Sequence, residues 1–471
     1  MNRIEPDDFF TNSPPARIIG TEVEYTINPK KIADMKGVLP YIIGSMHDDF
    51  ASNGARIYED VSHLEYASAE ALGPLDAAAT DHAGKSIVQT AFELVEDTDH
   101  ADRPPLRCSG TYDIRDNTVY TKGYHENYMF PTLEVDTMRL LMDTLSAHIA
   151  TRALWYGGGL AYDSGYSLSQ KGKGIGAAIG YGYGSRTTIG KKSLAGILGG
   201  RMNGEKLQQE WSLLEIRHAD PHMLPHATYL GLATTSLVLR LIEQGVIGVH
   251  NVEEYALLEP VATAHTTDAL LTNSHSSSKI KLKNSHSTSP LEIQKRLAKA
   301  SYDMCNEGDV KLPEDEQLAA EQWLRLVHDV EQSLSSRNLS LLFGRVEWAT
   351  KLHILQQRGV SGCGTDIRAV QIDQNWAMLS PESISELVAK RMLARNEEAR
   401  TIQTLADSYV TSPPKTRTAI RGSLIADNPS ADWRICRVSW SGVDIIPKNQ
   451  PWTYEYIPLS DPYAHIPCDD Y

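Results

Sequence analysis

Acidic side chains in the first 70 residues form the pattern that points most directly to chemistry. Glu22 and Glu24 are two residues apart in RIIGTEVEYTI (17–27), whose alternating β-branched residues predict a strand. Side chains at i and i+2 of a strand point to the same face. Both carboxylates therefore lie side by side and repel one another unless a cation or a basic group lies between them. Glu65 and Glu70 follow in a later predicted strand, EYASAE.

Carboxylate oxygens are the ligands that hard divalent cations such as Mg²⁺ prefer. The spacing of the N-terminal acids is therefore compatible with a metal site, and the alternative is a strand with two solvent-facing acids. Asp60 ends a further predicted strand, ARIYED (55–60), which follows the turn signal Asn53-Gly54. An aspartate at a strand end beside other carboxylates can act as a base or a nucleophile. As an alternative, Asp60 caps a turn.

Composition excludes several classes of function. The chain has 471 residues, and its 45 basic and 60 acidic side chains give a net charge of −15. Such an acidic balance argues against general nucleic-acid binding. No apolar run reaches the roughly 18 residues that a membrane helix needs, and the N-terminus lacks the pattern of a signal peptide. The 5 cysteines form no CxxC pair, so we expect a reducing, cytoplasmic environment without a disulfide framework.

The order of predicted elements favours an α+β fold in which strands come first and helices follow. Pro413-Pro414 marks the start of a last region of short strands and turns. Hydrophobic residues at helical spacing predict helices at His82–Val95, Leu133–Trp155, Tyr229–Gln244, 291–305, 318–335, 346–357 and 382–399.

Several motifs occur in an order that resembles the Pup ligase and depupylase family, which belongs to the carboxylate–amine ligases related to glutamine synthetase. The opening motif is more similar to a depupylase than to a ligase, and the resemblance runs from about residue 17 to 440. The motifs are RIIGTEVEY, NGARIYEDVSHLEYASAE, DHAGK (81–85), HENY (125–128), LSQK (168–171), TYLGLATTSLVL (228–239) and SPPKTRTAIRG (412–422).

The resemblance implies a curved antiparallel sheet that forms a cradle, packs on a helical layer and carries a small C-terminal domain. On this basis we expect a polar tail at 1–16, the cradle at 17–400 and the small domain at 401–471. Family members bind ATP and Mg²⁺ on the concave sheet face. Ligases join the C-terminal glutamate of the small protein modifier Pup to a lysine, and depupylases hydrolyse that isopeptide bond. By position, the resemblance makes Glu22, Glu24 and Glu70 metal-facing carboxylates, Asp60 the catalytic aspartate and His125–Tyr128 its support.

Departures from the family pattern cluster where the nucleotide is held. Lys171 stands where the family has arginine, and residues 112–114 replace a Lys-Asn-Asn stretch. Leu213, Leu214 and Glu215 replace an Arg-Leu-His stretch, and 190–204 replaces a segment that helps to hold the nucleotide. Because phosphoryl groups need positive surroundings, these changes predict weak or absent nucleotide binding. If a nucleotide does bind, the basic residues that could replace the missing phosphate contacts are Arg186, Lys191 and Arg201.

Two arginines of SPPKTRTAIRG, Arg417 and Arg421, are the expected contacts for Pup, which is acidic and folds on binding. They lie in 380–437, where nine lysines and arginines exceed seven acids. As an alternative, they form structural ion pairs.

Two further patterns are weaker. GKGIGAAIG (172–180) fits no phosphate-binding loop and favours glycine turns. A metal site at His218, His222 and His226, with Asp220, is disfavoured because Pro221 and Pro225 interrupt the helix that such ligands need.

The sequence therefore favours a catalytically impaired, depupylase-like protein that binds Pup or pupylated proteins and modulates pupylation and depupylation. The first alternative is an active ATP-dependent depupylase. The second is a ligase that joins a small carboxylate to an amine. We expect no nucleic-acid partner and no membrane partner.

Overall fold

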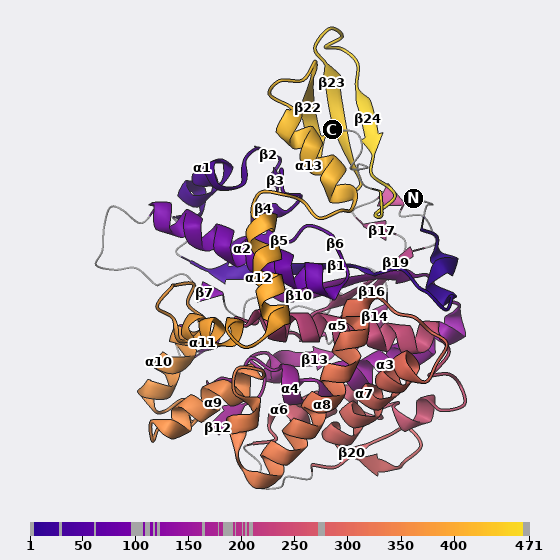
Figure 1. The fold of residues 1–471 in the computed structure, drawn as a ribbon, viewed down its shortest axis with the longest axis vertical. Coiled ribbons are helices and arrows are strands. Elements are labelled where there is room, and N and C mark those ends of the chain that lie inside the picture. Colours follow the sequence, from indigo (N-terminus) through magenta and orange to yellow (C-terminus); the bar gives the residue numbers. More distant parts are fainter. Residues whose placement is uncertain are drawn as a thin grey trace.

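The computed structural model has the α+β architecture that the sequence predicts: a large sheet packs on a layer of helices (Figure 1). Helices α6–α9 lie at one end of the long axis, and a small unit with helix α13 and strands β22–β24 lies at the other. The structure describes residues 4–27, 31–60, 63–95, 107–108, 114–115, 118–119, 123–162, 165–177, 179–181, 192–193, 195–199, 201–202, 205–206, 211–271 and 278–464.

The central sheet has the strand order β14-β16-β19-β10-β1-β5-β4-β3-β2, and β6 and β7 also pair with β1. It is antiparallel except where β14 and β16 pair in parallel. Its strands are β1 (Ile18–Thr26), β2 (Met46–His47), β3 (Phe50–Ala51), β4 (Arg56–Asp60), β5 (His63–Ala67), β6 (Ala71–Leu72), β7 (Arg107–Cys108), β10 (Tyr124–Pro131), β14 (Gly180–Tyr181), β16 (Ala195–Gly199) and β19 (Trp211–Ile216).

The remaining strands form small separate sheets. They are β8 (Ile114–Arg115), β9 (Thr118–Val119), β11 (Leu160–Tyr162), β12 (Gly165–Ser167), β13 (Ile175–Ala177), β15 (Lys192–Ser193), β17 (Arg201–Met202), β18 (Glu205–Lys206), β20 (Ile280–Lys281), β21 (Ser287–Thr288), β22 (Trp433–Val438), β23 (Gly442–Pro447) and β24 (Glu455–Pro458).

The helices include long amphipathic segments that bury one face against the sheet or against each other. They are α1 (Ile32–Ile43), α2 (Pro74–Val95), α3 (Val135–Thr151), α4 (Ala153–Tyr156), α5 (Pro225–Glu243), α6 (Pro260–Asp268), α7 (Pro290–Asn306), α8 (Glu314–Ser336), α9 (Glu347–Gln357), α10 (Ile367–Trp376), α11 (Ile384–Leu393), α12 (Glu397–Tyr409) and α13 (Arg417–Asp427). Among the described residues, no helix is long and apolar enough to span a membrane.

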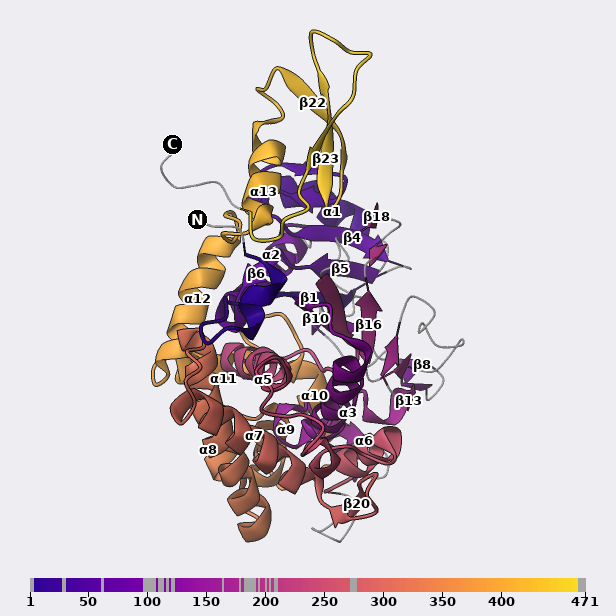
Figure 2. The same cartoon turned by 90° about the vertical axis from the view of Figure 1, so that its right-hand side faces the viewer.

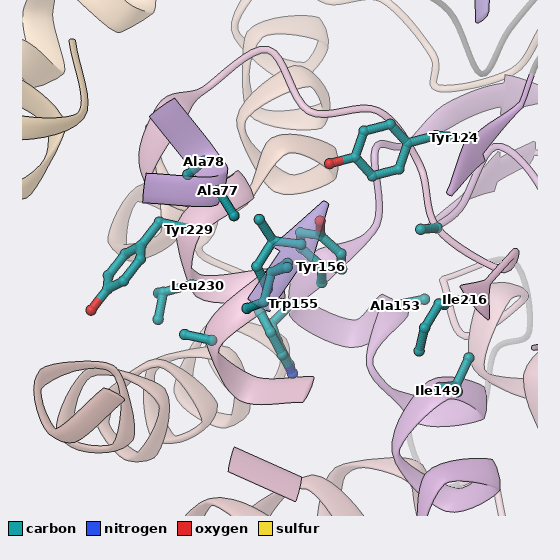
Figure 3. Close-up of a cluster of buried hydrophobic side chains, with 14 of the residues drawn as sticks. Ala77, Ala78, Tyr124, Ile149, Ala153, Trp155, Tyr156, Ile216, Tyr229 and Leu230 are labelled. Carbon is teal, nitrogen blue, oxygen red and sulfur yellow. The ribbon is translucent and has the colours of Figure 1, made fainter. Parts of the chain in front are cut away.

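Side chains of strands β1 and β10 alternate between an apolar face and a polar face of the sheet. Val23 of β1 and Tyr124 and Tyr128 of β10 are buried in the core against the helices. Figure 3 shows Tyr124 in this cluster of buried side chains. Glu22 of β1 pairs with His125 of β10 on the other face. This period-two alternation is what the sequence predicts for a sheet with one packed face. We call the polar side the carboxylate face.

Residues of the DHAGK motif fasten α2 to the sheet. Asp81 accepts a hydrogen bond from Thr21 Oγ1 of β1 at 3.2 Å and pairs with Lys85. Lys85 Nζ also donates to the carbonyl of His222, before α5, at 2.6 Å. A Cβ at Gly84 would lie 2.4 Å from the Tyr66 ring, so only glycine lets α2 approach β5 this closely.

A buried ion pair joins the sheet to α3. Arg152, directly after α3, makes two hydrogen bonds to Glu126 of β10, at 2.9 and 3.0 Å. Both side chains are almost inaccessible to solvent, at 2% and 0% exposed. Arg152 also donates to the His218 carbonyl and to Thr235 Oγ1, each at 3.1 Å. These bonds hold the loop after β19 to the helical layer.

The C-terminal subdomain, residues 411–464, has a core of its own. Ile425 of α13 packs with Ile435 of β22 and Val443 of β23, and Phe50 of β3 completes the cluster. By contrast, α12 packs against α2 and contributes to the main core. The chain therefore enters the small core only after α12.

Several helix predictions differ from the structure. The predicted helix 382–399 is two helices, α11 and α12, because Asn396 caps the second one through its side chain. Helices α6, α10 and α13 were not predicted, and α13 lies where only short strands and turns were expected. These three helices have 9 to 11 residues, too short for periodicity to separate them from loops.

Replacement of Arg152 by methionine should lower the free energy of unfolding by about 3–5 kcal/mol, because Glu126 would remain buried without its cation. Arg139 pairs with Asp136 at the surface, so Arg139→Met should cost less than about 1 kcal/mol. Urea denaturation followed by circular dichroism measures both. Equal losses for the two variants would contradict the structural role of the buried pair.

Candidate active site

Three carboxylates meet on the carboxylate face. Oxygen atoms of Glu24 on β1, Asp60 on β4 and Glu65 on β5 all lie within 4.8 Å of one another. Glu24 and Glu65 are register partners on neighbouring strands, and Asp60 ends β4 beside them in an exposed position. Among the described residues, this is where side chains that can bind a metal converge. Because hard cations prefer such oxygen ligands, these residues fit Mg²⁺.

Glu65 is the most buried of the three, with 5% of its surface exposed. Burial raises the pKa of Glu65 to about 7; the negative charges of Glu22 and Glu24 also raise it, and a hydrogen bond from Tyr58 opposes the rise. Tyr58 Oη donates that bond to Glu65 Oε1 at 2.6 Å. Near neutral pH, Glu65 is therefore protonated in part of the molecules, and a bound cation would displace that proton. In the sequence, Glu65 belongs to the acidic pattern but has no predicted role.

Glu22 lies beside these carboxylates and has partners on β10. Its Oε2 lies 3.0 Å from His125 Nδ1, and its Oε1 accepts a hydrogen bond from Asn127 at 3.1 Å. The structure therefore brings Glu22, Glu24 and Asp60 to one face, together with two polar residues of the HENY motif. The metal role of Glu22 and the catalytic role of Asp60 stay predictions.

Glu70 lies in a different environment from the other acids. It accepts hydrogen bonds from Arg417 Nε at 2.8 Å and from Arg421 Nη2 at 2.5 Å, both of α13. Burial alone would raise the pKa of Glu70, but the charges of Arg421 and Arg417 outweigh it and lower the pKa. Both arginines are largely buried. The structure thus contains the ion pairs that the sequence left open as an alternative, and the predicted metal and Pup contacts of these residues stay untested.

A pocket lies between the carboxylate face and the C-terminal subdomain. Strand β1 contributes Glu22, the segment between β5 and β6 contributes Ser68 and Glu70, and the subdomain contributes Arg417 and Trp440. The pocket borders the three carboxylates through Glu22. Polar and aromatic groups next to a cation site are suited to a ligand with a ring and an anionic part.

Two arginines that the sequence analysis missed bring positive charge to this face. The Arg56 guanidinium of β4 lies 4.4 Å from the ring centre of Tyr58, and Arg56 Nε is buried with no hydrogen-bond partner among the described residues. Arg217, directly after β19, makes a two-bond pair with Glu215 at 2.7 and 2.8 Å. The signal in the sequence that places them on this face is the period of two in a strand. Arg56 precedes Tyr58 and Asp60 by even numbers of residues, and Arg217 follows Glu215 by two.

The other predicted residues lie elsewhere. Lys171 is buried and donates from Nζ to the Tyr124 carbonyl at 3.0 Å. Arg201 lies in β17 and Ile114 in β8. Tyr112, Asp113, Arg186 and Lys191 lie outside the described residues.

The three histidines are buried near α5. The His222 ring stacks on Tyr156 with 4.1 Å between the ring centres, and burial lowers the pKa of His226 to about 4. His218 and its neighbours do not belong to the cluster of metal-binding atoms found among the described residues.

The affinity for Mg²⁺ should rise with pH, because the proton on Glu65 competes with the cation. Below pH 7, the rise should be up to about tenfold per pH unit, and above pH 7 the affinity should level off. Titration calorimetry in buffers of different ionisation enthalpy measures both the affinity and the released proton. Glu65→Gln should bind Mg²⁺ more weakly and without this pH dependence. An equal pH dependence in both proteins would show that another group titrates.

Glu70→Gln should destabilise the protein by about 3–5 kcal/mol, since two buried guanidinium groups would lose their carboxylate. Its Mg²⁺ affinity should stay within about threefold of the wild-type affinity, because Glu70 is not among the three carboxylates that converge. A threefold change corresponds to less than about 1 kcal/mol of binding free energy. Glu93→Gln, an exposed change on α2, is the control for stability. A large loss of Mg²⁺ affinity without loss of stability would instead identify Glu70 as a metal ligand.

Comparison with known proteins shows relatives over nearly the whole chain. A Pup--protein ligase of Acidimicrobium ferrooxidans is 27% identical over 482 residues, covering 95% of this chain and 96% of the relative. A Pup deamidase/depupylase of Mycobacterium tuberculosis is 23% identical, covering 90% of this chain and 81% of the relative.

Solved structures show the same fold. The ligase PafA, in its complex with the prokaryotic ubiquitin-like protein Pup, matches with a TM-score of 0.75 and 19% identity, covering 96% of this chain and 91% of that chain. PafA in complex with ADP matches with a TM-score of 0.71 and 20% identity, covering 93% of this chain and 92% of that chain. The family model described as Pup-ligase protein matches residues 7–444. The chain therefore belongs to the Pup-ligase protein family.

Proposed function

We propose that this protein binds Pup, free or attached to another protein, and uses Mg²⁺ and a nucleotide to act on the isopeptide bond between Pup and a lysine. The observation that carries this proposal is the meeting of Glu24, Asp60 and Glu65 within 4.8 Å. Family membership and the relatives named as ligases and as depupylases supply the substrate class. The solved relatives with Pup and with ADP support the same partners.

The carboxylates would have different roles because their surroundings differ. Glu24 and Glu65 face each other across β1 and β5 and would hold the cation, with Glu22 beside them. Mg²⁺ bound there would neutralise phosphate charge and polarise an oxygen. Asp60 is the exposed member, so it can reach a substrate and accept a proton from the nucleophile that attacks the carbonyl. That nucleophile would be water in hydrolysis, where the lysine amine leaves, and a lysine amine in ligation, where phosphate leaves a carboxyl group that ATP has phosphorylated.

The nucleotide would occupy the pocket beneath the C-terminal subdomain. Trp440 offers a ring for stacking and Ser68 a hydroxyl. A base placed against the subdomain would direct its phosphates along the carboxylate face past Glu22. Arg56, with its buried Nε lacking a partner among the described residues, supplies a cation on that route.

A catalytically impaired regulator, the function that the sequence favoured, is the second candidate. One contact favours it: Glu70, expected at the metal, is paired with Arg417 and Arg421. In that case the protein would bind Pup or pupylated proteins and alter their processing by other enzymes without turning them over itself. The described carboxylates make the active form the better supported candidate.

Asp60→Asn separates the two candidates. In an active enzyme, it should lower the cleavage of a pupylated protein, or Pup ligation, by about 10²–10⁴-fold in the presence of Mg-ATP. Pup affinity should change by less than about threefold, because the substitution keeps the size of the side chain. Gel-based turnover and fluorescence titration with labelled Pup measure the two quantities.

The control for this experiment is Glu59→Gln, a neighbouring exposed residue on β4 that pairs with Leu64 on the opposite face to Asp60. Pup binding without turnover in the wild type would establish the regulator. The proposal as a whole fails if the wild type binds neither Pup nor a pupylated protein.

A further inference from the structure

Charged residues on the carboxylate face lie in rows that run across the strands. In one row, Glu22 of β1 is paired with His125 of β10 on one side and with Ala67 of β5 on the other, and Ala67 is paired with Arg56 of β4. Arg217 follows Glu215, which is the register partner of Asn127 on β10. Because β10 and β19 are antiparallel, extending this register by two residues along each strand places Arg217 opposite His125. The row therefore has an arginine at each end.

The neighbouring row is acidic. Glu24 of β1 is paired with Glu65 of β5, and Glu65 is paired with Tyr58 of β4. The cation site proposed above therefore lies next to the row that Arg56 and Arg217 flank. The row thus has an arginine at both ends and a predicted divalent-cation site beside it. Such an arrangement is suited to binding a polyphosphate.

Arg217 is held in a fixed direction by Glu215. Its Nε and Nη2 donate to the two carboxylate oxygens at 2.8 and 2.7 Å, and each side chain is 15% exposed. The negative charge of Glu22 also acts on Arg217. Glu215 Oε1 lies 3.8 Å from His125 Nδ1, so the pair is part of the polar surface that includes Glu22. A guanidinium has five N–H donors and can bind a carboxylate along one edge and a phosphate oxygen along another.

We propose that Arg217 binds the terminal phosphate of the nucleotide and that Glu215 positions its guanidinium for this contact. This inference rests on the proposed function, since it requires a nucleotide in the pocket. The pocket lies toward Ser68 and Trp440, so a base bound there leaves the phosphates to extend toward Glu22 and the cation site. Arg217 lies beside that end of the ligand. Glu215, which as a lone carboxylate would repel phosphate, is neutralised by the same guanidinium.

A purely structural role for Arg217 makes a different prediction. If Arg217 only neutralised Glu215, then removal of both charges would restore nucleotide binding. If Arg217 contacts the phosphate, the double variant would remain defective, because the contact itself is lost. A double-variant cycle therefore distinguishes the two roles.

The experiment measures the affinity of the full-length protein for Mg-ATP and for AMP by titration calorimetry. The variants are Arg217→Met, Glu215→Gln and the double variant. Arg368→Met is the matched control, because Arg368 makes a similar two-bond pair with Asp366, two residues away, on an exposed surface. A thermal unfolding curve for each variant confirms that it is folded.

Arg217→Met should weaken Mg-ATP binding by about 10- to 100-fold, as expected for the loss of a charge-assisted contact. AMP, which lacks the terminal phosphates, should bind within about threefold of the wild-type affinity. Glu215→Gln should weaken Mg-ATP binding less than Arg217→Met does, and the double variant should stay as weak as Arg217→Met.

Three results would overturn the inference. Unchanged Mg-ATP affinity in Arg217→Met would remove Arg217 from the site and leave the proposed function standing. Recovery of binding in the double variant would assign Arg217 a neutralising role only. Equal weakening for AMP and Mg-ATP would place the contact elsewhere on the ligand. By contrast, a wild type that binds no Mg-ATP would refute the nucleotide site of the proposed function, and the inference with it.

Discussion

Repulsion among the carboxylates of β1, β4 and β5 is the constraint around which the site is built. Oxygen atoms of Glu24, Asp60 and Glu65 are held within 4.8 Å of one another, and burial together with the charges of Glu22 and Glu24 raises the pKa of Glu65. Backbone pairing of the three strands keeps them there, while the opposite sheet face is packed on helices. Paired charges such as Glu126 and Arg152 secure that packing. A rigid sheet can thus keep acids together that a flexible loop would let separate.

The C-terminal subdomain is fastened beside the site by Glu70, which lies between β5 and β6. Glu70 binds both Arg417 and Arg421, which in turn donate to the backbone carbonyls of Leu459 and Gly54. This contact places Trp440 over the carboxylate face, where it forms one wall of the pocket. Figure 2 shows the subdomain beyond the sheet, with α13 on the side that faces the sheet. Glu70 is therefore one of the points at which the two parts of the molecule are joined, together with Phe50 of β3, which packs in the subdomain core.

Positive charge around the site comes from residues other than those that the family resemblance led us to expect. Arg56 and Arg217 lie on the carboxylate face, whereas Lys171 is buried under the sheet with its amine on the Tyr124 carbonyl. Glu215, which the family resemblance predicts to stand in place of a basic stretch, has Arg217 two residues later on the same strand face.

The sequence by itself determined the α+β class, the strands that carry Glu22, Glu24 and Asp60, and the common face of Glu22 and Glu24, because period-two alternation and turn signals are local properties. Only the tertiary structure decided which acids meet. Glu65 joins Glu24 through strand register, and Glu70 is withdrawn by Arg417 and Arg421, which lie 347 and 351 residues away. Strand order, register and domain contacts depend on packing between distant segments, and the spacing of residues along one chain does not encode those distances.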